Sequence, residues 1–201
     1  MVTDFAKDVF KEDRQKTWDE YTGNKPPTIR HNFVDYDRYY EASLIAGALI
    51  EKGVNLKNLN VLDFGCCAGD YGMYFARWGA FVHFEDIDED ALKFVDYRLR
   101  REGLKRRYNH EEHNLAIYGE VLEHCDDALA ILTKDVEDGV RYIFTSSYPY
   151  RSDDPNDSYW QGRGHSQQAR IDQPACRKIL EDHYVMINFG GQRNLWIKKE
   201  D

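Results

Sequence analysis

One stretch of the chain, residues 60–92, constrains the fold more than any other part of the sequence. It contains two short apolar runs, each followed by a segment with helical spacing of its apolar residues. The first run, within residues 61–64, stops at Gly65, and the second, within residues 81–84, stops at two acidic residues. A short apolar run that ends abruptly is typical of a buried parallel strand. The pattern therefore predicts a strand–helix–strand unit with a ligand site at the carboxyl ends of its strands.

The two helices expected in this stretch have recognisable ends. Asp70 opens the first helix, and Gly79 lies just past its end, where a helix often requires a residue with positive φ. We expect Asp88 to cap the second helix. Two further acidic residues lie in the first turn of that helix, where the helix dipole favours negative charge. The helix boundaries therefore agree with the strand boundaries.

The glycine spacing argues against a dinucleotide as the ligand. Counted from Gly65, the dinucleotide fingerprint requires glycine at positions 67 and 70, but the chain has Cys67 and Asp70 there. A carboxylate at the start of the helix would repel a pyrophosphate. Asp86 follows Asp63 by 23 residues, which is close to the offset of roughly 20 residues for an acidic residue that binds a ribose. The stretch therefore predicts a ligand with an adenosine ribose but no phosphate.

Three short segments of the chain follow a pattern known from a large enzyme family. Residues 61–69 read Val-Leu-Asp-Phe-Gly-Cys-Cys-Ala-Gly, residues 86–87 read Asp-Ile, and residues 120–124 read Glu-Val-Leu-Glu-His. The first two segments resemble the first and second motifs of class I S-adenosylmethionine (SAM)-dependent methyltransferases. The third resembles the segment after strand four in ubiquinone-type O-methyltransferases. The similarity covers about residues 38 to 199. The alternative interpretation is a strand–helix–strand turn that binds no ligand.

This resemblance implies an α/β protein with the Rossmann-like class I methyltransferase fold. Its sheet would have seven mostly parallel strands and a C-terminal antiparallel hairpin, with helices on both faces. The implied activity is transfer of a methyl group from SAM to an oxygen or nitrogen atom of an unidentified small-molecule acceptor, which leaves S-adenosylhomocysteine (SAH). The alternatives are a metal-dependent RNA 2′-O-methyltransferase and a SAM-binding protein without transfer activity.

The resemblance also assigns cofactor-binding residues. Asp63 would face the methionine amino group, and Asp86 would bind the ribose hydroxyls. In the ubiquinone-type enzymes an arginine in the helix before the first strand contacts SAM, and Arg38 is the candidate here. The alternative for Arg38 is a solvated helix charge. The remaining candidates are Gly65, Cys66, Cys67, Gly69, Ile87, Gly119, Glu120 and Val121.

Cys67 stands where the family has the middle glycine of its first motif. If the backbone requires positive φ at this position, a cysteine is strained there. If the position requires only a small side chain, a cysteine fits. The sequence leaves both alternatives open.

The third motif contains one of the two candidate catalytic residues, His124. Glu120, Glu123 and His124 are spaced i, i+3, i+4, so one helical turn would place all three on one face. Carboxylates and an imidazole there could hold a divalent ion, and the RNA 3′-end 2′-O-methyltransferases, which this motif also resembles, can hold magnesium. The alternative is a motif that only caps and orients the helix, and we assign no metal from the sequence. His124 is a candidate general base, because histidine titrates in the useful range. The alternative for His124 is a packed, hydrogen-bonded histidine. His165 is a second candidate catalytic residue.

Three other segments of the chain each give a separate prediction. Residues 98–107 contain six positive charges, which indicate either a solvated helix end or a surface that grips an anionic substrate or RNA. Residues 106–109 are expected to supply the third strand, as a short polar edge strand. Residues 146–168 lack apolar periodicity, and a structureless segment of that length in a compact domain is usually functional.

The length and composition of the chain limit the number of domains, the partners and the location that we expect. The 201 residues suit one methyltransferase domain at 35–201, preceded by an N-terminal helical extension or lid at 1–34. The net charge of −9 disfavours nucleic acid as a partner. The four cysteines form no C-x-x-C pair and suit reduced thiols. No apolar run approaches the length of a membrane span, so we expect a cytoplasmic protein without a membrane partner, whose oligomeric state is open.

Overall fold

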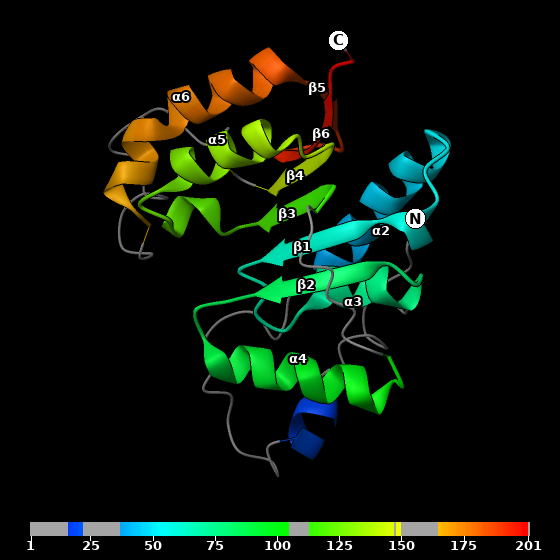
Figure 1. Ribbon diagram of the computed structural model, residues 1–201. Helices are drawn as coiled ribbons and strands as arrows, with labels where there is room; N and C mark the ends of the chain where they lie inside the picture. The colour runs from blue at the N-terminus through cyan, green and yellow to red at the C-terminus, as the bar shows by residue number, and fades with distance from the viewer. Residues whose placement is uncertain (1–15, 22–36, 105–112, 147, 150–164, 201) are drawn as a thin grey trace. The chain divides into compact units, whose positions relative to one another are not determined.

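The computed structural model describes residues 16–21, 37–104, 113–146, 148–149 and 165–200. Residues 16–21 are helical. The elements that follow (Figure 1) are α2 Asp37–Glu51, η1 Leu56–Asn58, β1 Asn60–Phe64, α3 Asp70–Arg77, β2 Phe81–Glu85, α4 Glu89–Arg101, β3 Leu115–Gly119, η2 Leu122–His124, α5 Ala128–Asp138, β4 Tyr142–Ser146, α6 Gln167–His183, β5 Tyr184–Asn188 and β6 Arg193–Lys198.

The six strands form one mixed sheet in the order β2-β1-β3-β4-β6-β5. β3 pairs in parallel with both β1 and β4, whereas β6 pairs antiparallel with both β4 and β5. The predicted α/β fold with a C-terminal antiparallel hairpin is therefore confirmed. The predicted count of seven strands is corrected to six for the residues that the structure describes. The additional strand was expected at residues 106–109, and these lie outside the described residues.

The chain divides into two compact units, which are described separately. The first comprises Met1–Asn58 and Gly65–Asn109, and the second comprises Leu59–Phe64 and His110–Asp201. The first unit contains α2, α3, β2 and α4, and the second contains the other five strands with α5 and α6.

The first unit is held together by close packing of α3 on its neighbours. α2 packs against α3, and α3 packs against β2. The approach of α3 to β2 depends on Gly72, because a Cβ atom there would lie 2.2 Å from Cε1 of Phe84 and 2.8 Å from Cγ1 of Val82. Asp88 caps α4 as predicted, and its side chain accepts a hydrogen bond of 2.9 Å from the Asp90 N–H.

The helix at residues 16–21 packs on α4 in the same unit. Trp18 is 3 % exposed and lies edge-on to Phe94, with 5.0 Å between ring centroids. Tyr21 contacts Phe94 and Tyr97, and Arg101 Nε donates to Glu20 at 3.0 Å. Trp18 and Phe94 also share one buried cluster with Ala68, which follows β1 in the chain. The predicted lid has this one described helix, and the other residues of 1–34 lie outside the described part of the chain.

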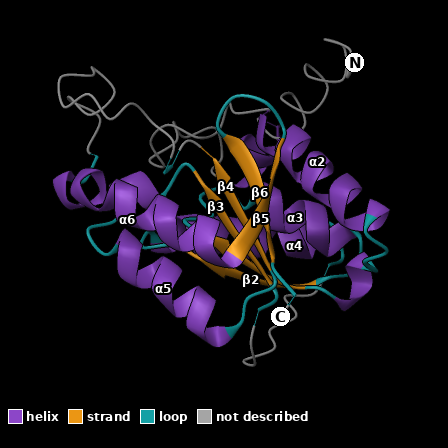
Figure 2. Ribbon diagram, turned by 90° about the horizontal axis from the view of Figure 1, so that it is seen from above, coloured by secondary structure: helices purple, strands orange, loops and turns teal. Residues whose placement is uncertain are grey.

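The second unit has an apolar core around two fully buried strands, β3 and β4. Helices α5 and α6 pack against each other on one face of these strands (Figure 2). Trp196 is buried there, and its Nε1 donates to Thr145 Oγ1 at 3.0 Å. Tyr118 donates to Asp135 Oδ2 at 2.7 Å, so these two buried polar side chains are paired with each other. No helix among the described residues is both long enough and apolar enough to cross a membrane.

Candidate active site

A tight turn follows β1, and we call residues 65–69 the glycine turn. Cys66 N–H donates to the Glu85 carbonyl at 3.0 Å, and Gly69 N–H closes the turn on the Cys66 carbonyl at 2.7 Å. Gly65, Cys67 and Gly69 have positive φ, at 63°, 49° and 75°. Of the two alternatives for Cys67, the left-handed one is therefore observed, in a conformation that costs an L-residue roughly 1–2 kcal/mol.

The carboxylate of Asp86 holds the glycine turn against the end of β2. Its Oδ2 accepts the Cys67 N–H at 2.8 Å, and its Oδ1 accepts the Asp88 N–H at 2.8 Å. An ionised carboxylate has about four lone-pair positions, so each oxygen can accept one more hydrogen bond. Ile87, between the two acidic residues, is fully exposed. The glycine turn is thus in direct contact with Asp86, the acidic residue that the spacing predicted to bind a ribose.

Arg98 is a residue of this region that the sequence did not single out. Of the two alternatives for the basic run at residues 98–107, the solvated helix end is wrong for Arg98, which is only 5 % exposed. Its Nη1 pairs with Asp70 Oδ1 at 2.7 Å. Burial alone would lower the pKa of Arg98, but the Asp70 carboxylate and Tyr39 raise it, so the guanidinium stays charged. The spacing of Asp70 and Arg98, 28 residues apart, gives no local signal for this pair.

Arg38 is buried on α2, with 5 % exposure. Its guanidinium carbon lies 5.9 Å from the centroid of the Tyr71 ring, on α3. The Tyr71 hydroxyl in turn donates to the carboxylate of Glu41. The alternative of a solvated helix charge is therefore wrong, and the contact with SAM stays a prediction.

The remaining predicted cofactor-binding residues lie in the second unit. Asp63 is buried in β1, and Gly119 ends β3. Glu120 is exposed and has a φ of 54°, and Val121 is the cap of η2. The left-handed residue breaks the helical register, and the helical residues begin only at Leu122. The prediction that one helical turn carries Glu120, Glu123 and His124 on one face is therefore wrong.

Glu123, His124 and His165 form what we call the histidine cluster. One potential ligand atom from each lies within 4.8 Å of the others, and the two imidazole centroids are 4.7 Å apart. Glu123 is buried, His165 is half-buried and His124 is exposed. The structure thus brings together the two histidines that the sequence named as catalytic candidates. Among the described residues the cluster does not include Glu120.

Hydrogen bonds of Ser166 connect the segment that contains Glu123 and His124 to the segment that contains His165. Its N–H donates to the Glu123 carbonyl at 2.8 Å, and its hydroxyl donates to Asp126. The same hydroxyl caps α6 by accepting the Ala169 N–H at 3.1 Å. The cap therefore fixes His165, its predecessor in the chain, beside η2. The helix begins at Gln167, inside the stretch 146–168 that was expected to lack regular structure.

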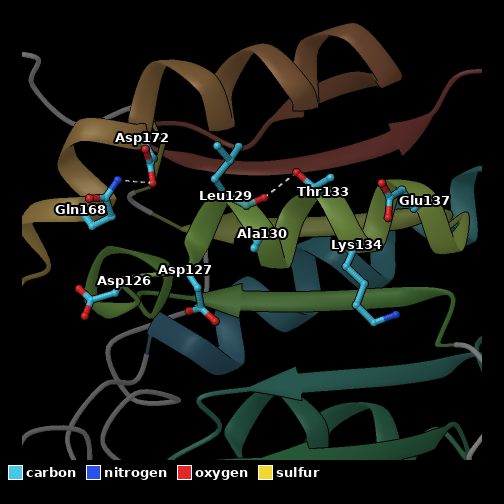
Figure 3. Close-up of a pocket in the computed structure, with 9 residues that line it drawn as sticks. All are labelled: Asp126, Asp127, Leu129, Ala130, Thr133, Lys134, Glu137, Gln168 and Asp172. Carbon is cyan, nitrogen blue, oxygen red and sulfur yellow. Dashed lines mark hydrogen bonds between the residues drawn. The ribbon is translucent and has the colours of Figure 1, made fainter.

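A groove of about 620 Å³ lies along α5 and α6 in the second unit (Figure 3). Gln168 Nε2 donates to Asp172 Oδ2 at 2.9 Å across one end of it. The basic residue in its lining is Lys134, which pairs with Asp138 at 2.6 Å. The acidic residues of the lining are Asp126, Asp127, Glu137 and Asp172. The groove therefore disfavours anionic ligands, and it contains none of the predicted site residues.

Comparison with solved structures defines the class of fold. The chain has the Rossmann-like fold of class I methyltransferases, as the motifs implied, and the neighbours that follow support this at the level of fold. No protein-family model matches the chain. No curated protein matches it in sequence.

Three solved structures illustrate the likeness. Magnesium protoporphyrin IX methyltransferase from Synechocystis PCC 6803, with bound SAH, is 19 % identical with a TM-score of 0.59, and the match covers 97 % of this chain and 99 % of the other. The SAH-bound methyltransferase PaMTH1 from Podospora anserina is 14 % identical with a TM-score of 0.57, covering 93 % and 88 %. The methyltransferase domain of bacterial CtHen1-C is 16 % identical with a TM-score of 0.51, covering 81 % and 100 %.

Proposed function

We propose that the chain is a SAM-dependent methyltransferase that methylates an oxygen or nitrogen atom of a small-molecule acceptor and releases SAH. One observation carries the proposal: the Asp86 carboxylate is fixed at 2.8 Å from the Cys67 N–H of the glycine turn. In this fold two of the similar structures hold SAH. A second structure of the Synechocystis enzyme holds SAM.

The residues of the turn fit the adenosyl part of this cofactor. Each oxygen of Asp86 accepts one backbone N–H and keeps capacity for one ribose hydroxyl. The turn stays narrow because a Cβ atom on Gly69 would lie 2.7 Å from Cγ2 of Val95. We assign the adenosine to the turn and to the exposed side chain of Ile87. By resemblance, the methionine part is assigned to Asp63, Gly119 and Val121, and Arg38 and Glu120 are further candidates for binding the cofactor.

The chemistry required of the protein is modest. When bound, SAM supplies a methyl group already activated by its sulfonium, and the chain aligns the acceptor with it. A hydroxyl acceptor must also lose a proton. We assign His124 as the group that takes this proton and His165 as its partner in the histidine cluster, because their rings lie 4.7 Å apart. We place the reaction in the cytoplasm, because all four cysteines are free thiols.

The test is calorimetric titration with SAM and SAH, followed by transfer of labelled methyl from SAM to fractionated metabolite pools. We expect both ligands to bind and one small-molecule fraction to become labelled. Absence of any binding would contradict the proposal. Binding without transfer to any pool would instead favour a SAM-binding protein that has no transferase activity.

The histidine cluster favours a second candidate, a divalent-metal-dependent 2′-O-methyltransferase acting on RNA. Glu123, His124 and His165 offer one carboxylate and two imidazoles within 4.8 Å, a donor set that suits a divalent ion. A bound ion would polarise the acceptor hydroxyl. Labelled transfer to RNA that requires Mg²⁺ or Mn²⁺, and is lost in His165→Ala but kept in His183→Ala, would support this candidate. Equal transfer in the presence of a chelator would exclude it.

A further inference from the structure

We propose that Arg98 is a positioning residue for the cofactor, because its guanidinium holds the Ala68 carbonyl of the glycine turn. The inference rests on the proposed function and adds a residue that none of the three motifs contains. Arg98 lies on α4 and is 5 % exposed. Its role is therefore exerted from within the protein, through the backbone of the turn.

The guanidinium of Arg98 binds three acceptors at once. Nη1 donates both to the Ala68 carbonyl and to Asp70 Oδ1, the latter at 2.7 Å. Nη2 donates to the Tyr39 hydroxyl at 3.1 Å. A planar guanidinium with five fixed N–H donors suits such a set of acceptors, which a single ammonium group does not match. The turn, the start of α3 and α2 are thus tied to one side chain of α4.

Two opposite charges hold consecutive residues of the turn. The carboxylate of Asp86 accepts the N–H of Cys67, and the guanidinium of Arg98 binds the carbonyl of Ala68. Between them the turn closes through the 2.7 Å hydrogen bond from Gly69 to Cys66. Charge-assisted hydrogen bonds are stronger than neutral ones. The conformation of Cys67, unfavourable for a non-glycine residue, is therefore held from both sides.

Arg98 also neutralises the carboxylate of Asp70, the first residue of α3. Asp70 is 1 % exposed, and a buried carboxylate without a cation is strongly unfavourable. Its pairing with Arg98 allows an acidic residue to follow the glycine turn directly. A role confined to this ion pair would affect only the stability of the fold. A positioning role would also affect the affinity of the folded protein for the cofactor.

Arg77 offers a matched control for this distinction. It belongs to the same set of side chains, since its Nη1 donates to the Tyr39 hydroxyl and its Nε donates to Glu102 at 2.6 Å. Its hydrogen-bond partners, Tyr39 and Glu102, both lie outside the glycine turn. Loss of Arg77 therefore removes a comparable cation from the network while the turn keeps both of its anchors.

The experiment compares SAH affinity with melting temperature in the wild type, Arg98→Met and Arg77→Met. We expect Arg98→Met to bind SAH at least about tenfold more weakly, which is the effect of losing a hydrogen bond to a charged group. Arg77→Met should melt at a lower temperature, with an SAH affinity within about twofold of the wild type. Titrations are made at a temperature where circular dichroism shows each variant to be folded.

A double variant keeps the test informative if Arg98→Met does not fold. In Arg98→Met/Asp70→Leu both charges are removed together, so no buried carboxylate is left alone, while the Ala68 carbonyl still lacks its donor. Unchanged SAH affinity in either folded variant would overturn the inference. Failure of both variants to fold would also overturn it, because Arg98 would then have only a structural role in stabilising the fold. Failure of the wild type to bind SAH would instead contradict the proposed function.

Discussion

The glycine turn of the first unit and the histidine cluster of the second unit are built in different ways. In the turn, backbone groups are bound by charged side chains, at Cys67 by Asp86 and at Ala68 by Arg98. In the cluster, His124 is exposed and His165 is half-buried. The backbone of the turn is therefore held by two charged side chains, whereas in the cluster the exposed His124 is accessible to solvent.

The two regions also differ in how their residues are brought together. Asp86 and Arg98 bind the backbone of the turn directly, whereas His124 and His165 are brought together through the backbone and side chain of Ser166. Under the proposed function, the turn would bind the cofactor and the cluster would serve the acceptor. The following predictions separate the two roles.

The largest expected effect concerns the histidine cluster. His124→Gln should lower kcat by about 10²–10⁴-fold, the usual contribution of a general base, and leave the SAH affinity unchanged. His183→Gln, a change of the exposed histidine that ends α6, is the control and should leave kcat unchanged. The measurements are labelled transfer and calorimetry. A loss of SAH affinity in His124→Gln would mean that the cluster binds the cofactor, and an unchanged kcat would remove His124 as a base.

The second effect concerns the carboxylate of the turn. Asp86→Ala should weaken SAH binding by about 1.5–3 kcal/mol, the value of hydrogen bonds to a charged group. Asp88→Ala removes a neighbouring carboxylate that caps α4 and should cost about 1 kcal/mol of stability, with SAH affinity preserved. Calorimetry and urea unfolding measure the two quantities. Equal affinities in the two variants would remove Asp86 from the cofactor site.

A third prediction concerns the packing that supports the turn. Gly72→Ala places a Cβ atom 2.2 Å from the Phe84 ring and should lower the free energy of unfolding by about 1–3 kcal/mol. Gly47→Ala is a matched change in α2, where a Cβ atom would have no neighbour within 4 Å. It should raise the free energy of unfolding by up to about 1 kcal/mol, through helix propensity. Urea unfolding of both proteins is the measurement, and effects of the same sign would contradict the close approach of α3 to β2.

The smallest effect tests the charge around the histidine cluster. Burial, together with the carboxylates of Asp127, Glu123 and Asp126, raises the pKa of Cys125 to about 11. The thiol should therefore react slowly with iodoacetamide at pH 8, and its reaction rate should rise with a midpoint of about pH 11. Asp127→Asn should move that midpoint down. Peptide mass spectrometry follows the labelling, and a midpoint near the ordinary thiol value of about 8.5 would show that Cys125 lacks this buried, negatively charged environment.

The local parts of the fold could be predicted because neighbouring residues determine them. The apolar run before Gly65, the helix opened by Asp70 and the cap at Asp88 all appear where the spacing placed them. Strand and helix periods and caps depend on residues within about one turn of each other. The resemblance of the three motifs added the class of fold, which the similar structures support.

The predictions that were wrong concern residues whose local sequence pattern is overridden by a distant contact or by an unusual backbone conformation. Arg98 has the sequence context of a solvated helix end, but Asp70 and Ala68 draw it into the interior. The spacing of Glu120 and Glu123 is that of a helix, but a positive φ at Glu120 delays the helical residues to Leu122.

By itself, then, the sequence determined the strand–turn–helix unit and its caps, and predicted Asp86 as the ribose-binding residue, because hydrophobic period and glycine spacing act over short distances. Only the tertiary structure decided that Arg98 anchors the turn and that His165 lies beside His124. Both depend on the meeting of chain segments far apart in sequence, because the buried charge of Arg98 reaches Asp70, and the Ser166 N–H reaches the Glu123 carbonyl, only once those segments have packed.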